Sequence, residues 1–278
     1  MPRIVIFLDL DDTILQTAPK CPADQPLTPA AFNRAGEALS FMTRAQQRLL
    51  AFWLEQGVVI PVTGRTDDAL ARVSIDFTSW RITHHGAVIR RADGSLPTWW
   101  YTEVRPKLVA AQPLLWGLSA RLSAEAGGQY RVSNHSVDEW LTYISVKTNA
   151  EDATLIRVQE RLDSLGLPPE LAVHCNGNNL ALTVRGAQKH DAVRRVTAEL
   201  EREGPLVTIG AGDSLTDLPF MRICDFALTP RNSQIQRETW EAVAHPPRPD
   251  PLPREEEESS PVAKALTPLA AASEGGVC

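Results

Sequence analysis

An apolar stretch near the start of the chain runs directly into a cluster of carboxylates. Residues 4–8 read IVIFL, and Asp9, Asp11 and Asp12 follow at once. The stretch shows no alternation of apolar and polar residues, which is typical of a strand covered on both faces in a parallel sheet. The sequence therefore predicts an α/β fold in which the repulsion among these carboxylates is offset by a partner of opposite charge.

Helices and strands alternate along the rest of the first part of the chain. Residues 16–36 contain four prolines and predict a loop or flap. A helix is predicted over 40–57, begun by Ser40 or Thr43 and ended by Gly57. The elements predicted after this helix are a strand at 58–65, a short helix at 66–76 and a strand region at 81–89. This order is typical of a doubly wound sheet.

The pattern changes after residue 86 and returns near residue 186. The elements predicted between them are a hairpin turning at Asp93-Gly94, a helix over 106–128 with a break near Pro113, two strands in 129–148, a helix over 152–166 with Leu155, Ile156, Leu162 and Leu165 on its apolar side, and a hairpin turning at Asn176-Gly177. Hairpins and helices in this order favour an inserted α+β domain.

Four segments of the chain follow from these patterns. We predict a doubly wound parallel-sheet core built from residues 1–86 and 186–245, and a second, α+β domain of residues 87–185 inserted into it. Residues 246–278 are rich in Pro and Glu, and this composition predicts a disordered acidic tail.

Polar motifs stand at the ends of predicted core strands, where open parallel sheets bind ligands. They read DLDDT (9–13), VTGR (62–65), RGAQK (185–189) and GDSLTD (212–217). In an extended chain Asp9 and Asp11 face the same way. A hard cation such as Mg²⁺ would compensate their negative charge, with Asp213 as a further ligand. The Thr63 hydroxyl, the backbone N–H near Gly64 and the Lys189 cation form a cradle suited to a phosphoryl group.

Composition restricts the partners that we expect. The formal net charge is −6 without a basic stripe, which argues against nucleic acid, and no apolar stretch approaches the length of a membrane span. The four cysteines form no CxxC pair or metal-ligand spacing, so we expect free thiols in the reducing cytoplasm. The sequence leaves the oligomeric state open.

The four ordered motifs resemble those of the haloacid dehalogenase-like superfamily of aspartyl-phosphate hydrolases. FLDLDDT matches its first motif, Thr63 the second, Lys189 the third and GDSLTD the acidic fourth. The position of the insert resembles a C2 cap of the IIB type, the branch of sucrose- and trehalose-phosphate phosphatases, Cof-like hydrolases and phosphomannomutase. Asp12 stands where the family often has Gly, and Thr216 where the branch often has Asn.

The resemblance implies a role for each matched residue. Asp9 would be the nucleophile, and Asp11 the acid and base that serves the leaving oxygen and then water. Asp9, the Asp11 backbone carbonyl and Asp213 would bind Mg²⁺, and Asp217 would be a further ligand or hold the waters of the metal. Thr63, Gly64 and Lys189 would bind the phosphoryl oxygens.

The expected function is Mg²⁺-dependent hydrolysis of a small phosphorylated metabolite, with a sugar phosphate as the leading substrate. Two alternatives stay open. A phosphosugar mutase would use the same motifs, and a non-catalytic binding protein would retain the fold and the metal site without turnover.

Overall fold

The protein is described by a computed structural model that covers residues 2–148, 153–164, 166–176 and 179–240. The predicted tail 246–278 lies outside these residues. The strands are β1 (Arg3–Leu8), β2 (Leu27–Phe32), β3 (Ala38–Thr43), β4 (Val58–Pro61), β5 (Arg81–Thr83), β6 (Val88–Arg90), β7 (Arg131–Val137), β8 (Trp140–Lys147), β9 (Leu171–Asn176), β10 (Asn179–Val184), β11 (Leu206–Ala211) and β12 (Phe226–Leu228). The helices are α1 (Arg44–Gln56), α2 (Asp67–Leu70), α3 (Arg105–Glu125), α4 (Ala153–Ser164), α5 (Lys189–Glu201), α6 (Leu218–Met221) and α7 (Gln234–Trp240), with short helical turns η1 (Ala18–Lys20), η2 (His84–Gly86) and η3 (Trp100–Val104).

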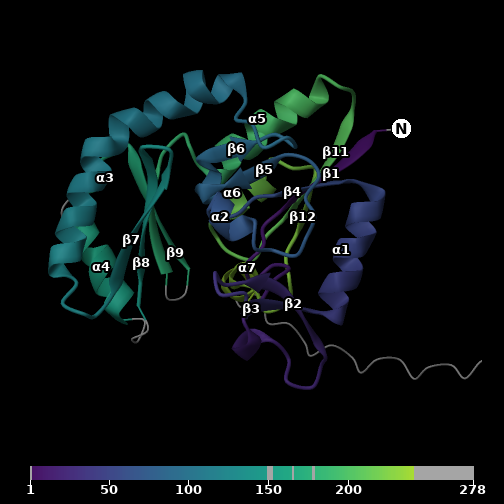
Figure 1. Cartoon of the computed structure of the whole chain (residues 1–278), viewed down its shortest axis with the longest axis horizontal. Coiled ribbons are helices and arrows are strands. Elements are labelled where there is room, and N and C mark those ends of the chain that lie inside the picture. Colours follow the sequence, from purple (N-terminus) through teal and green to yellow (C-terminus); the bar gives the residue numbers. More distant parts are fainter. Residues whose placement is uncertain (1, 149–152, 165, 177–178, 241–278) are drawn as a thin grey trace, which may run out of the picture. The chain divides into compact units, whose positions relative to one another are not determined.

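A parallel sheet in the order β12-β11-β1-β4 confirms the predicted α/β core. The central strand β1 is covered on both faces, as its sequence predicts. Val5 and Phe7 pack into one hydrophobic cluster with α5, while Ile6 and Leu8 pack into a second with α1. Figure 1 shows α1 and α5 on opposite sides of this sheet.

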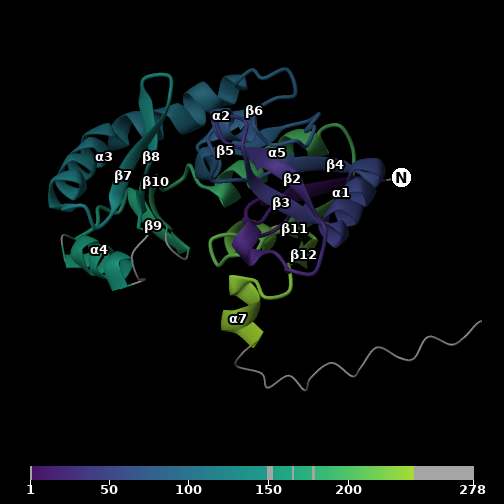
Figure 2. The same ribbon diagram turned by 60° about the horizontal axis from the view of Figure 1, so that its bottom comes forward.

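A second, antiparallel sheet in the order β7-β8-β10-β9 comes from the middle of the chain. We call residues 100–184, from η3 to β10, the insert. Its helices α3 and α4 cover one face of this sheet, and Figures 1 and 2 show them on the side away from the parallel sheet. The hydrophobic cluster on the α5 side of β1 continues into the insert through residues such as Leu141 and Ile144. The division into core and cap domains at residues 87 and 185 stays a prediction.

The segment before α1 contains a strand that the sequence did not predict. Residues 16–36 were expected to be a loop or flap, and within them 27–32 form β2, which pairs with β3. Pro29 is tolerated because this two-stranded ribbon is irregular, with register shifts next to Pro29. The helix predicted next is confirmed, and of its two candidate N-caps, Ser40 and Thr43, it is Thr43 that accepts a hydrogen bond from Gln46 N.

The Asp93-Gly94 turn is present, but it does not join two strands. Gly94 N donates to Arg91 O, and the chain then continues into helical structure. The strand before this turn, β6, pairs with β5 through the turn at 84–86. The predicted hairpin, in which this strand would pair with the segment after Gly94, was therefore wrong.

Two expectations for the insert helices were also wrong. Residues 105–125 form one helix despite Pro113, because a proline removes only one backbone hydrogen bond and the buried Leu108 and Leu115 hold the helix against its sheet. In α4, Ile156 is exposed rather than on the apolar side, whereas Leu155 and Leu162 are buried. Leu165 and Gly177 lie outside the described residues.

No helix among the described residues combines the length and the apolar character needed to cross a membrane.

Candidate active site

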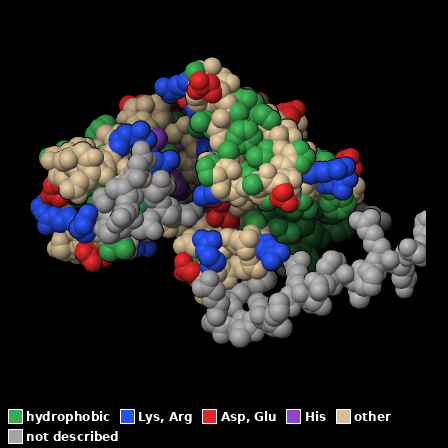
Figure 3. All heavy atoms as spheres, turned by 90° about the horizontal axis from the view of Figure 1, so that it is seen from below, with side chains coloured by type: hydrophobic (Ala, Val, Ile, Leu, Met, Phe, Trp, Pro, Cys, Tyr) green, Lys and Arg blue, Asp and Glu red, His purple; other side chains and the backbone are tan. Residues whose placement is uncertain are grey.

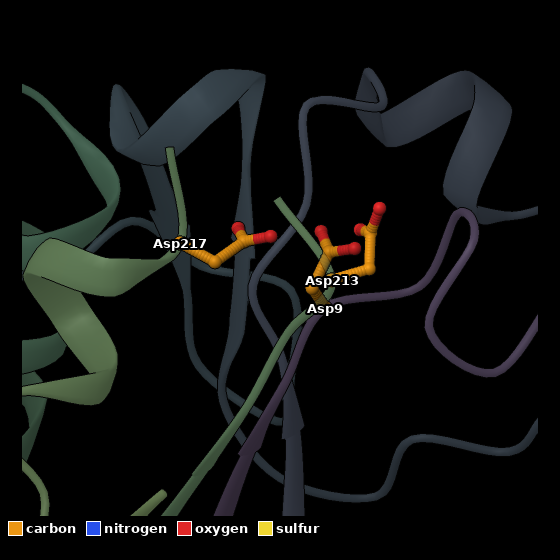
Figure 4. A group of neighbouring side chains, drawn as sticks. All are labelled: Asp9, Asp213 and Asp217. Carbon is orange, nitrogen blue, oxygen red and sulfur yellow. The ribbon is translucent and has the colours of Figure 1, made fainter. Parts of the chain in front are cut away.

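Three buried carboxylates meet at the carboxyl end of the parallel sheet. Asp9 follows β1, Asp213 follows β11, and Asp217 immediately precedes α6. The strand ends are level because Leu8 lies opposite Ala211 in the sheet. Each carboxylate offers an oxygen within 4.8 Å of the others, and Figure 4 shows the side chain of Asp217 pointing toward the other two.

Lys189, the first residue of α5, lies between two of these carboxylates. Its Nζ donates to Asp9 Oδ1 at 2.6 Å and to Asp217 Oδ1 at 2.7 Å, and the side chain is buried. Burial acts to lower the pKa of Lys189, but Asp217 and Asp9 together raise it above its usual value. The lysine therefore stays charged, and one cation faces three carboxylates.

Neighbouring hydroxyl groups orient the carboxylates further. Thr13 Oγ1 donates to Asp9 Oδ2 at 3.0 Å and lies 3.3 Å from Asp213 Oδ1. The backbone N–H and the hydroxyl of Ser214 both donate to Asp217 Oδ2, and the hydroxyl of Thr216 contacts that of Ser214. Thr216 thus acts through Ser214, and Asp217 keeps a full set of hydrogen bonds.

The excess of negative charge in this group suits a divalent cation. Burial raises the pKa of Asp9 well above its usual value, against the opposing effect of Lys189. Burial, followed by the charge of Asp217, raises the pKa of Asp213 to about 7. Clustered carboxylate oxygens are hard ligands of the kind that Mg²⁺ takes, and a bound cation would remove the need for these protons. Asp9, Asp213 and Asp217 therefore fit the proposed metal.

The pKa of Asp213 predicts a pH dependence of stability. Because this pKa is 3.8 in the unfolded chain and about 7 in the fold, the native protein binds an extra proton between these pH values. This contribution to stability is full below pH 3.8 and is lost as the pH rises through 7. Without metal, we expect the free energy of unfolding of the wild type to fall relative to Asp213→Asn by up to about 1.4 kcal/mol per pH unit in that range.

Urea denaturation of both proteins in EDTA, repeated across this pH range, measures the difference. Excess Mg²⁺ should stabilise the wild type at the upper end of the range and have a smaller effect on Asp213→Asn. A difference between the two proteins that does not change with pH would contradict the assignment.

Asp11 does not join the buried group, although it was expected to face the same site as Asp9. Its side chain is 54% exposed and forms a two-pronged ion pair with Arg65, with Nε to Oδ2 at 2.8 Å and Nη2 to Oδ1 at 2.6 Å. The strand ends at Leu8, so the alternation of an extended chain no longer applies at residue 11. The neighbouring Asp12 has a φ of 62° and pairs with Lys20, so it adopts a left-handed turn geometry that Gly enters most readily.

The loop after β4 carries Thr63 and Gly64. Thr63 is buried, and its Oγ1 accepts a hydrogen bond from Arg65 N at 3.1 Å. A Cβ on Gly64 would lie 2.5 Å from the His85 ring, so a glycine is needed here to make room for the imidazole. The sequence suggested another reason for this glycine, the approach of its backbone to an anion.

One hydrogen bond joins the insert to this loop. Tyr143 of β8 is buried, and its hydroxyl donates to the carbonyl oxygen of Gly64 at 3.0 Å. The rings of His135 and Tyr143 stack with centroids 4.2 Å apart, and His85 lies edge-on to the same tyrosine at 4.8 Å. The tyrosine is thus fixed from two sides and holds the loop that carries Thr63.

We expect Tyr143→Phe to cost about 1–2 kcal/mol of unfolding free energy, because the Gly64 carbonyl loses a buried donor. Activity should fall severalfold, since the loop with Thr63 becomes less well positioned. Thermal unfolding and steady-state kinetics measure the two effects. Tyr101→Phe is the matched control, because Tyr101 is 48% exposed. Equal behaviour of the two variants would show that the contact is unimportant.

The sequence assigned no role to several residues of this site. Thr13, Arg65 and Ser214 stand inside the recognised motifs, and their position there was an available signal. His85 and Tyr143 come from segments without a motif, and only the packing of the insert against the sheet brings them to Gly64.

Comparison with known proteins gives matches of structure alone. No protein-family model and no curated protein matches the chain by sequence. The structure is similar to that of the sucrose-phosphatase from Synechocystis, solved with sucrose and phosphate, with 16% identity, coverage of 88% of this chain and 89% of that one, and a TM-score of 0.57. It is also similar to the C-terminal domain of trehalose-6-phosphate phosphatase from C. albicans, with 13% identity, coverage of 89% and 78%, and a TM-score of 0.52.

Both similarities extend over most of the chain. At these identities they concern the fold. The chain therefore shares the α/β fold of these sucrose- and trehalose-phosphate phosphatases.

Proposed function

We propose that the chain is a Mg²⁺-dependent phosphomonoester hydrolase that acts on a small phosphorylated metabolite, with a sugar phosphate as the leading candidate. The observation that carries the proposal is the contact of Lys189 with Asp9 at the edge of a group of three buried carboxylates. A cation beside the carboxylate that we propose as the nucleophile supports phosphoryl transfer, because it can stabilise the negative charge of the transferring group. The sugar substrate is suggested by the two similar phosphatases.

Asp9 is the nucleophile in this proposal. One carboxylate oxygen forms a bond to phosphorus while the bond from phosphorus to the leaving oxygen breaks, which gives an aspartyl phosphate. Lys189 and the Thr63 hydroxyl bind the remaining phosphoryl oxygens. Asp9, Asp213 and Asp217 would hold Mg²⁺, which would supply positive charge to stabilise the transferring group.

Asp11 is the general acid and base in this proposal. It gives a proton to the leaving oxygen and then takes one from the water that attacks the aspartyl phosphate, so Asp9 and inorganic phosphate are released. In the ion pair with Arg65, Asp11 is an acceptor only, so Arg65 has to release it when the leaving oxygen arrives. The exposed position of Asp11 leaves room for this exchange.

A test is the release of inorganic phosphate from a panel of sugar phosphates in Mg²⁺, with EDTA as the control. We expect turnover in Mg²⁺ and its loss in EDTA. An isomerised sugar phosphate without free phosphate would favour a mutase, and metal binding without turnover on any substrate would favour a binding protein. The cytoplasmic location stays a prediction.

A further inference from the structure

A cavity lies next to Lys189 on the side facing the insert. Its volume is about 320 Å³, and the lining side chains that can bind a ligand by hydrogen bonds or charge include His85, His174, Arg185, Gln188, Lys189 and His190. We call it the basic cavity. Lys189 also contacts Asp9. A substrate whose phosphoryl group lies at Asp9 would therefore have its leaving group within reach of this cavity. Figure 3 shows histidine, lysine and arginine side chains around a hollow in the surface.

The described residues that line the basic cavity include no aspartate or glutamate. The charge of Lys189 is already matched by Asp9 and Asp217. Arg185 differs, because it has no carboxylate partner among the ion pairs of the described residues. Its Nε donates to the carbonyl oxygen of Leu171 at 2.9 Å, which anchors the guanidinium at the edge of the cavity and leaves its terminal nitrogens to bind an anion.

The pKa of His174 indicates the sign of the electrostatic potential inside the cavity. Burial, followed by the charges of Lys189, His190 and Arg185, lowers the pKa of this histidine to about 4, with Asp217 opposing. A position where neighbouring cations disfavour an added positive charge favours a negative one. The side-chain amide of Gln188 donates to His174 Nε2 at 2.7 Å, so the proton of the neutral ring is assigned to Nδ1 as a further donor.

An anionic substituent matches the charges of this lining better than a neutral sugar does. Sugar hydroxyls donate as well as accept hydrogen bonds, and carboxylates are strong acceptors for them. The charged side chains of this cavity, Arg185 and Lys189, only donate. An anionic substituent needs donors and positive charge, and the cavity supplies both.

We infer that the leaving group of the substrate carries a second acidic group, a carboxylate or a second phosphoryl group, which Arg185 binds in the basic cavity. The inference rests on the proposed hydrolase function and narrows its substrate class to doubly acidic phosphate esters. Arg185 is a specificity residue that acts on the remote end of the substrate, so it affects KM for these esters more than kcat.

The experiment compares phosphate release from glucose 6-phosphate, 6-phosphogluconate and glucose 1,6-bisphosphate. We expect kcat/KM to be at least tenfold higher for one or both acidic esters, and the better one identifies the acidic group as carboxylate or phosphoryl. Arg185→Gln should remove that advantage through KM and change hydrolysis of glucose 6-phosphate less than threefold. Arg48→Gln, at an exposed arginine of α1 away from the cavity, is the control.

Several outcomes would overturn the inference while the hydrolase proposal stands. These are a preference for glucose 6-phosphate, no effect of Arg185→Gln, or an equal loss on all three esters, which would place Arg185 on the transferring phosphoryl group. If no ester releases phosphate, the hydrolase proposal fails for this panel, and calorimetric titration of the same three compounds tests the cavity directly. Tighter, Arg185-dependent binding of the acidic esters would then support the inference, and equal binding would overturn it.

Discussion

Asp9→Asn is expected to lower the rate of phosphate release by a factor on the order of 10⁴, because an amide cannot serve as the nucleophile that forms the acyl phosphate. The side chain is nearly isosteric. The amide oxygen can keep the hydrogen bond from Lys189, and the amide NH₂ can donate to the Thr13 hydroxyl instead of accepting from it. The fold should therefore survive the change. Since burial raises the pKa of Asp9, removal of this carboxyl also relieves some electrostatic strain in the metal-free protein.

Phosphate release from the preferred ester, measured next to thermal unfolding of both proteins, checks this expectation. Asp24→Asn is the matched control, since Asp24 is exposed in the loop before β2. If Asp9→Asn retains wild-type turnover, or if it loses activity only because it unfolds, the assigned role of the nucleophile is not supported.

Lys189→Met should have the largest effect on stability. Methionine has a similar length but no charge, so Asp9 and Asp217 would be left buried without their cation. Breaking a buried ion pair from one side typically costs about 3–5 kcal/mol, because the remaining charges stay uncompensated. We also expect turnover to fall by about 10²–10³-fold, since the transferring phosphoryl group loses a preorganised cation.

Urea denaturation in EDTA and in excess Mg²⁺ separates the two contributions. Mg²⁺ should recover part of the lost stability of Lys189→Met, because a cation that binds only the native carboxylates stabilises the fold by mass action. Lys147→Met, at an exposed lysine of β8, should change stability by less than about 0.5 kcal/mol. A Lys189→Met protein as stable as this control in EDTA would contradict the buried ion pairs.

The core could be predicted from local patterns because those patterns report burial directly. An apolar strand without alternation has to be covered on both faces, and β1 places Phe7 and Leu8 in separate hydrophobic clusters. The errors arose where tertiary contacts outweigh local preferences. Pro113 stays inside α3 because its helix is packed against a sheet, and Pro29 stays within β2 because the two-stranded ribbon accepts an irregular register.

The sequence by itself determined that carboxylates stand at the end of a buried strand, with a threonine, a lysine and further carboxylates after later elements, because residue type and strand pattern are local properties. Only the tertiary structure decided which of them meet. Lys189 reaches Asp9 across 180 residues of chain, while Asp11, two positions from Asp9, turns to Arg65. The tertiary structure also brings Arg185 and His174 to one cavity next to Lys189. Such meetings depend on strand order and packing between distant segments, which no short stretch of sequence encodes.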